Sequence, residues 1–244
     1  MKVSIIASAI RTNLWEEFTT SLLSNKIEYE IIFAGPKAPD QEYPNLRHIQ
    51  TGNIKPAQCI YIASQHAKGE LIHWSADDCK YPDGLLDDVY SIWKGIGDDN
   101  TSIACETIEN GHVCPVESFI LYDHIKTSPI MAPLGFMSLK RLVELGGISD
   151  RRYTGGQYEN DLMMRHYAAG GRLFTYSHKL IELDHKNKHT NHHSDFSNGY
   201  KHGRKILEAS WPADFLPNRQ DAFEPFENTP DLYTKSQSHT GIWD

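Results

Sequence analysis

Short apolar runs rich in β-branched residues alternate with longer amphipathic segments along the first hundred residues. The apolar runs predict buried strands over residues 2–8, 29–35, 46–51 and 70–75. The amphipathic segments predict helices over residues 14–24, 56–69 and 82–95. This alternation predicts an α/β fold in which a mostly parallel, Rossmann-like central sheet is covered by helices on both faces.

The second half of the chain is less regular. Strands are predicted over residues 102–107, 118–123 and 172–177. Residues 136–147 read as a short strand feeding a helix, and residues 159–171 as a helix that ends on two glycines. We expect one domain over residues 1–210, with two halves, 1–100 and 101–210. The aromatic residues of the tail, 211–244, predict that it packs on this domain or on a partner subunit, so a homodimer is left open.

Two adjacent aspartates, Asp77 and Asp78, directly follow the predicted strand that contains LIHW. Burying two like charges is costly unless a positive group compensates them. A turn cap explains one of them, whereas a divalent cation explains both. In open α/β sheets, ligands bind beyond the carboxyl ends of the strands, which favours a ligand site here. The turn-cap interpretation stays open at this point.

Composition narrows the classes of function. The chain has 244 residues, 39% of them hydrophobic, and a formal net charge of −8, which disfavours nucleic-acid binding. No apolar run is long enough for a transmembrane helix, and the N-terminal run reads as a strand rather than a signal peptide. The four cysteines lack CxxC spacing, which predicts reduced thiols in a cytoplasmic protein; a disulfide between two of them is the alternative.

Three segments, taken in order, resemble the family 2 glycosyltransferases with the GT-A fold. The first is KVSIIAS, followed by EYEIIFAGP at residues 28–36. The second is AKGELIHWSADDCKYPDGLLDDV at 67–89, which resembles a strand, a DxD-type acidic motif and a Pro-led helix. The third is LKRLVELGGISDRRYTGGQYENDLMMRHYAAGGRLF at 139–174. The resemblance covers residues 1–186, and the order and spacing of the segments carry it.

The resemblance implies an inverting transfer of a sugar from a nucleotide-diphosphate sugar, a UDP-sugar above all, to a hydroxyl of a carbohydrate or lipid-linked acceptor. It also implies Mn²⁺ or Mg²⁺, which prefer carboxylate oxygen and stabilise a departing diphosphate. Asp77 matches the metal-binding end of the DxD motif, Asp78 follows it, and His185 is expected to complete the metal site. The sequence lacks the Gln-x-x-Arg-Trp motif of processive members, so a single addition is expected.

The base that takes the acceptor proton is expected just before the Asp-Leu helix. Glu159 matches the base, with Asp161 as the fallback, and Tyr158 stands where another acid is usual. A carboxylate at a helix N-terminus is kept ionised by the helix dipole. The alternative is that Glu159 and Asp161 only stabilise the first turn of the helix.

The residues expected to contact the donor follow the predicted strands. Ser75 stands where the family has a carboxylate that contacts the ribose, and Gly35 where it has an aspartate that reads uracil. The complete set of donor-binding candidates is Ala7, Ser8, Arg11, Gly35, Lys55, Gln58, Ser75, Ala76 and Asp77.

Two other functions remain open. A sugar nucleotidyltransferase needs a Gly-rich, basic loop after the first strand, and this chain has ASAIRTN there, without glycine. A sugar- or nucleotide-binding protein that has kept the fold without catalysis is favoured by the departures at Ser75, Tyr158 and Gly35.

Overall fold

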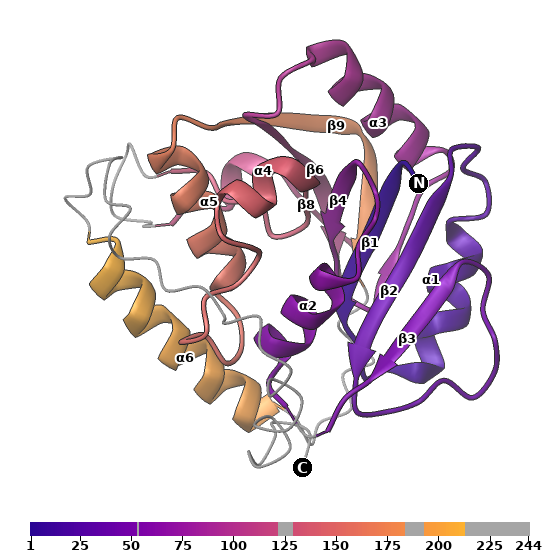
Figure 1. Cartoon of the computed structure of the whole chain (residues 1–244), viewed down its shortest axis with the longest axis horizontal. Coiled ribbons are helices and arrows are strands. Elements are labelled where there is room, and N and C mark those ends of the chain that lie inside the picture. The colour runs from indigo at the N-terminus through magenta and orange to yellow at the C-terminus, as the bar shows by residue number, and fades with distance from the viewer. Residues whose placement is uncertain (53, 122–128, 184–192, 213–244) are drawn as a thin grey trace.

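The computed structural model describes the chain except for residues 53, 122–128, 184–192 and 213–244 (Figure 1). Its strands are β1 Val3–Ser8, β2 Tyr29–Gly35, β3 Leu46–Gln50, β4 Leu71–Trp74, β5 Cys79–Lys80, β6 Thr101–Glu109, β7 His112–Cys114, β8 Gly135–Ser138 and β9 Arg172–Leu183. Its α-helices are α1 Trp15–Ser21, α2 Pro56–Gln65, α3 Leu85–Ile96, α4 Leu139–Glu144, α5 Tyr158–Ala168 and α6 His193–Ser210. Two short 3₁₀ helices span Thr12–Leu14 and Val116–Ser118.

One mixed sheet runs through both halves of the described chain, in the order β3-β2-β1-β4-β8-β6-β9-β5, with β7 paired to β6. The pairs β1–β2, β2–β3, β1–β4 and β6–β9 are parallel, and β8 lies antiparallel between β4 and β6. Strands β1, β2, β3, β4, β6 and β9 therefore share one direction, and their carboxyl ends lie at one edge of the sheet. The arrowheads of β2 and β3 mark this edge in Figure 1.

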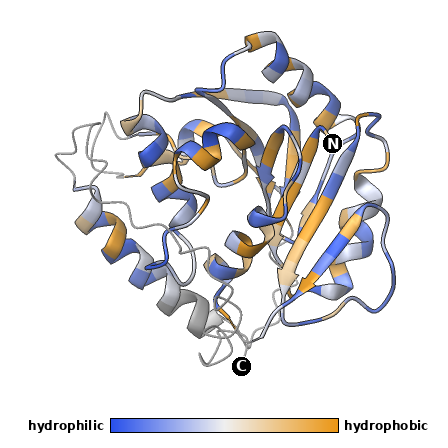
Figure 2. Cartoon of the chain, in the orientation of Figure 1, coloured by the Kyte–Doolittle hydropathy of each residue, from blue (hydrophilic) through white to orange (hydrophobic). Residues whose placement is uncertain are grey.

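The two faces of the sheet bury two separate hydrophobic clusters because side chains alternate along each strand. Ile6, Ile32 and Ile72 face a cluster that α2, α4, α5 and α6 cover. Their neighbours Ile5 and Ile31 face a second cluster that α1 and α3 cover. Figure 2 shows hydrophobic residues concentrated on the central strands, as a sheet covered on both faces requires. The predicted α/β architecture is thus confirmed.

Three expectations for the second half are corrected. A strand over residues 118–123 is wrong for the described part, where only Ile120 forms an isolated bridge, to Ile130. Its apolar neighbours Phe119 and Leu121 instead pack into the core from an irregular segment. Strand β9 continues to Leu183 rather than ending at residue 177, because it pairs with β6 along its length and with β5 at its end. Helix α6 was not predicted.

Two further expectations concern the whole chain. Cys59, Cys79, Cys105 and Cys114 are free thiols, as predicted. Among the described residues, none of the helices has the length and apolar character needed to cross a membrane. The predicted division at residues 100 and 210 stays a prediction, and the tail beyond Pro212 lies outside the described residues.

Candidate functional site

The predicted donor-binding residues gather at the carboxyl edge of the four parallel strands. Arg11 follows β1, Gly35 ends β2, and Lys55 lies between β3 and α2. Ser75 and Asp77 follow β4, which pairs directly with β1. Segments far apart in sequence thus meet at one edge, which is where open α/β folds bind ligands.

Asp77 is bound by donors of the loop that follows β1. Its Oδ2 accepts hydrogen bonds from the backbone N of Ile10 (2.7 Å), the backbone N of Arg11 (2.7 Å) and the indole Nε1 of Trp15 (3.3 Å). Its Oδ1 accepts from Arg11 Nε (2.8 Å) and forms an ion pair with Arg11 Nη2. The carboxylate is 1% exposed. Asp77 therefore ties the end of β4 to the start of the loop after β1.

Arg11 joins both aspartates of the pair. Its Nη2 lies 3.1 Å from Oδ1 of Asp78 while it also contacts Asp77. The Arg11 side chain is 26% exposed, whereas both carboxylates are 1% exposed, so the arginine forms the accessible part of the cluster. Burial alone lowers the pKa of Arg11, but the charges of Asp77 and Asp78 outweigh it, and the net shift is upward. The compensating positive group of the aspartate pair is thus an arginine.

Asp77, as placed here, does not fit the role of a ligand of a divalent cation. A carboxylate offers about four lone-pair positions, and five donor atoms already surround this one. Asp78 contacts the same guanidinium, and His185 lies outside the described residues. Among the residues that the structure describes, no group of three or more His, Cys, Asp or Glu could hold a metal ion. The predicted Mn²⁺ or Mg²⁺ stays a prediction without support from Asp77.

Ser75 takes part in a buried polar chain rather than facing the open edge. Its Oγ lies 2.6 Å from the hydroxyl of Tyr81, which lies 2.9 Å from Nε2 of His73. Nδ1 of His73 lies 2.9 Å from the carbonyl oxygen of Gly135, on the neighbouring strand β8. Burial lowers the pKa of His73 to about 4. The ribose contact predicted for Ser75 stays a prediction, and its hydroxyl already has a partner that the sequence did not indicate.

Gly35 has a packing reason for lacking a side chain. A Cβ at this position would collide with the carbonyl oxygen of Ala9, so the aspartate typical of the family cannot fit here without a backbone shift. Ala7 is fully buried in the α1-facing cluster and offers a ligand only backbone atoms, whereas Ser8 and Ala76 are partly exposed. Of these predicted donor contacts, Ser8 and Ala76 are the accessible ones.

Lys55 and Gln58 form the start of α2. Lys55 is the N-cap residue, and its backbone N donates to the side-chain Oε1 of Gln58 at 3.0 Å. Pro56 fixes the first helical turn, as the sequence predicted. Both side chains are partly exposed, and they stand at the positive end of the helix. Their role in donor binding stays a prediction.

Glu159 lies in the first turn of α5, directly after Tyr158 in the chain. Its Oε2 is buried and has no hydrogen-bond partner among the described residues. Burial raises the pKa of Glu159 above its ordinary value, and backbone N–H groups of the helix start offset this only in part. A carboxyl group with a raised pKa and a buried, unengaged oxygen is a candidate proton acceptor.

Tyr158, the first residue of α5, packs into a hydrophobic cluster to which α2 also contributes. Burial raises the pKa of Tyr158 well above its ordinary value, and Glu159 and Cys59 add to the shift. Cys59 lies in the first turn of α2, which starts at the carboxyl edge. Tyr158 also packs against the hydrophobic cluster that α2 and β4 share. Tyr158 therefore shares a hydrophobic cluster with α2, and the position of Glu159 at the donor edge stays a prediction.

Asp161 is engaged inside the protein. Its Oδ2 accepts from Arg165 Nε (2.9 Å) and its Oδ1 from the indole Nε1 of Trp211 (2.8 Å). Asp161 and Trp211 are fully buried, and Arg165 also donates to the carbonyl oxygens of Leu145 and Gly147 after α4. This network anchors α5 to α4 and α6, and it favours Glu159 over Asp161 as the base.

The histidine-rich stretch adds few described side chains to the candidate site. His178 on β9 and His202 on α6 are exposed, and His185 and His189 lie outside the described residues.

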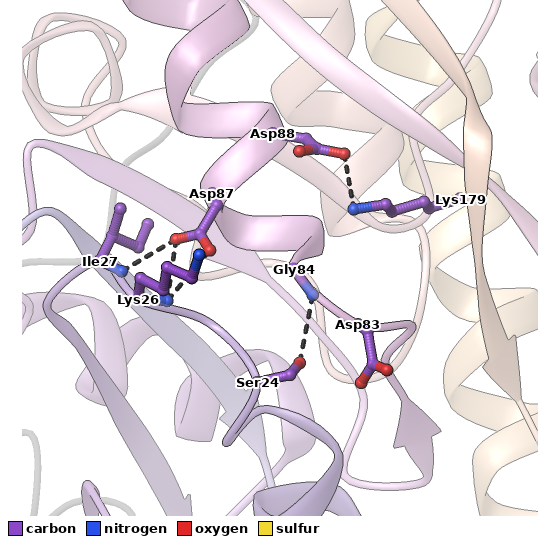
Figure 3. A pocket seen from close by; sticks show the side chains of 8 residues that line it. All are labelled: Ser24, Lys26, Ile27, Asp83, Gly84, Asp87, Asp88 and Lys179. Carbon is purple, nitrogen blue, oxygen red and sulfur yellow. Dashed lines mark hydrogen bonds and ion pairs between the residues drawn. The ribbon is translucent and has the colours of Figure 1, made fainter.

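An open pocket of about 590 Å³ is lined by Ser24, Lys26, Ile27, Asp83, Gly84, Asp87, Asp88 and Lys179 (Figure 3). None of the candidate residues lines it, and Asp87 and Asp88 are bound there by the backbone N of Ile27 and by Lys179. We assign it no chemistry.

Comparisons with known proteins were made by sequence and by structure. No protein-family profile and no curated protein matches the sequence. Crystal structures of TarS from S. aureus match the fold. The fragment 1–349 has a TM-score of 0.63 and 17% identity over 91% of this chain and 68% of that chain. Its complex with UDP has the same TM-score and identity.

The complex of this fragment with UDP-GlcNAc has a TM-score of 0.58 and 16% identity. This chain spans 42% of the longer TarS structure. At such identities the likeness shows the fold alone. This chain therefore has the mixed α/β, Rossmann-like fold of a glycosyltransferase, as the sequence predicted.

Proposed function

We propose that this protein transfers a sugar from a nucleoside-diphosphate sugar to a hydroxyl group of a carbohydrate or lipid-linked acceptor. The fold and the TarS complexes with UDP and UDP-GlcNAc support a UDP-sugar as donor. The observation that carries the proposal is Glu159, in the first turn of α5, whose Oε2 is buried and engaged by no described residue. The order of sequence segments supports membership in glycosyltransferase family 2.

In the proposed reaction, Glu159 accepts the proton of the acceptor hydroxyl. The acceptor oxygen forms a bond to the anomeric carbon, and the bond between that carbon and the diphosphate oxygen breaks. The electron pair of the broken bond leaves with the nucleoside diphosphate. A single displacement of this kind inverts the configuration at the anomeric carbon. Burial raises the pKa of Glu159, which makes its carboxylate a stronger base.

A second candidate is a nucleotide-sugar-binding protein without turnover. Two observations favour it: Ser75 is bonded to Tyr81, and Asp77 is surrounded by donors of its own chain. Both residues stand where the resembled family contacts its donor. This candidate shares the fold and the nucleotide ligand with the first and differs in catalysis alone.

The test is release of nucleoside diphosphate from a panel of UDP-, GDP-, CDP- and dTDP-sugars, with water or added saccharides as acceptors. We expect release by the wild type and its loss in Glu159→Gln. The matched control is Glu144→Gln on α4, where the carboxylate is 46% exposed. Full activity of Glu159→Gln would rule out the base. Nucleotide binding without release from any sugar donor would favour the second candidate.

A further inference from the structure

The surroundings of Asp77 disagree with the divalent cation that the resemblance implies. Three buried donors converge on Oδ2 from Ile10, Arg11 and Trp15, and two atoms of the Arg11 guanidinium converge on Oδ1. A cation can bind Asp77 only by displacing them. Displacement would leave these donors without partners, which is unfavourable away from water. The local fold therefore opposes metal binding by this carboxylate.

Arg11 supplies a positive charge beside the aspartates that were expected to hold the metal ion. It contacts both aspartates through Nη2 and is the accessible member of the cluster. Its Nη1 forms no hydrogen bond or ion pair with the residues that the structure describes. A guanidinium keeps its charge at all physiological pH values and binds phosphate oxygens through paired N–H groups. Arg11 can thus hold the aspartate pair through Nε and Nη2 and offer the N–H groups of Nη1 to a phosphate.

The cluster of Arg11, Asp77 and Asp78 needs a further positive group to attract a diphosphate. Two carboxylates and one guanidinium leave a net charge of −1, which does not by itself attract a diphosphate. Lys55 lies at the N-terminus of α2, at the same carboxyl edge. A helix N-terminus and a lysine both favour anions. The edge therefore offers two positive groups, Arg11 after β1 and Lys55 after β3, on either side of β2.

We infer that Arg11, with Lys55, supplies the positive charge of the donor site, so that nucleoside diphosphates bind this protein without a divalent cation. The inference rests on the proposed function and deepens it: the diphosphate of the donor is held by Nη1 of Arg11 together with Lys55. It also assigns the aspartate pair a positioning role, in which Asp77 and Asp78 orient the guanidinium.

The test is calorimetric titration of the wild-type protein with UDP, in EDTA and in Mn²⁺, with GDP, CDP and ADP as further probes. We expect the dissociation constant to differ by less than about threefold between the two conditions, and a difference of about tenfold or more would overturn the inference. Binding in Mn²⁺ alone would overturn it while leaving the proposed function intact. Binding of no nucleoside diphosphate in either condition would overturn both.

Variants test the arginine itself. Arg11→Lys keeps the charge and loses the fork, and we expect it to weaken UDP binding about tenfold in EDTA, since a bidentate arginine is not replaced by lysine. The control is Arg172→Lys, whose exposed side chain pairs with Asp98 at the start of β9. Melting temperatures identify misfolded variants. A folded Arg11→Lys protein with unchanged UDP affinity would overturn the assignment of Arg11.

Discussion

Asp77, after β4, and Glu159, in the first turn of α5, are two carboxylates with opposite surroundings. Five donor atoms from the loop after β1 surround Asp77. Glu159 has a buried oxygen without a hydrogen-bond partner in the described part of the chain. Burial without a partner costs stability, whereas burial with matched donors holds segments together. Asp77 is thus a carboxylate with structural partners, whereas Glu159 has an oxygen available for the proposed proton transfer.

The same contrast holds within one helix. Asp161 lies two residues after Glu159 and has partners on both oxygens. The sequence offered Glu159 as the base and Asp161 as the fallback, both in the first turn of α5. Their environments differ because side chains two positions apart point to different sides of a helix. Asp161 faces Arg165 and Trp211 inside the protein, whereas Oε2 of Glu159 meets no hydrogen-bond partner among the described residues.

The largest expected effect comes from Glu159→Gln. Glutamine keeps the size of the side chain and removes the base, and losing a general base lowers kcat by about 10²–10⁴-fold. The measurement is steady-state release of nucleoside diphosphate at saturating donor. Glu159 is proposed to act on the acceptor hydroxyl and not on the nucleotide. The affinity for UDP is therefore expected to stay at the wild-type value. Comparable loss of UDP binding would instead place Glu159 in the donor site.

Asp77→Asn is expected to act on stability. An amide removes the negative charge beside Arg11 and turns an N–H₂ group toward donors, and breaking a buried ion pair costs about 3–5 kcal/mol. Urea unfolding measures the change. The control is Asp98→Asn, which removes an exposed pair with Arg172 and is expected to cost at most about 1 kcal/mol. Equal losses in the two variants would show that Asp77 is not a structural carboxylate.

Trp211→Phe tests the anchor of α5. It removes the hydrogen bond to Asp161, and a bond to a charged group contributes about 1.5–3 kcal/mol. Trp93→Phe is a matched control, because the buried Nε1 of Trp93 has no hydrogen-bond partner in the described structure. We expect unfolding to show a larger loss for Trp211→Phe. The reverse order would contradict the role given to Trp211.

The smallest effect concerns pH. Because the pKa of Glu159 is raised above 4.5 in the folded protein, folding favours its protonated form. Stability is therefore lost as pH rises from 4.5 through the raised pKa, and Glu159→Gln should exceed the wild type in stability at neutral pH. This advantage should vanish below pH 4.5. In the same window kcat/KM of the wild type should rise with pH, as the base ionises. A variant that is less stable than the wild type at pH 7 would contradict the buried, unpartnered state.

The sequence predicted the parallel half of the fold well because local patterns determine it. Strand β2 has the predicted bounds, and the helix beginning at Pro56 was expected there. The start of α5 was predicted within one residue, which brought Glu159 to its first turn. These elements follow from apolar runs, proline and glycine, which act over a few residues.

The partners inside the site could not be predicted in this way. The donors to Asp77 lie 62–67 residues earlier in the chain, and Trp211 lies 50 residues after Asp161. Nothing in the local sequence marks such pairs, since they arise from strand order and helix packing. Helix α6 escaped prediction because its segment is polar and contains two glycines. Those glycines, Gly199 and Gly203, allow close approach to Gly155 and Gly156 before α5.

The most direct test compares unfolding free energy and nucleoside-diphosphate release in Asp77→Asn and Glu159→Gln. The account predicts that one variant loses activity and the other loses stability. Glu159→Gln should unfold at the same or a higher free energy than the wild type and release no nucleoside diphosphate, whereas Asp77→Asn should lose several kcal/mol of stability. A stable Glu159→Gln protein that still turns over donor at the wild-type rate would contradict the assignment of Glu159 as the base.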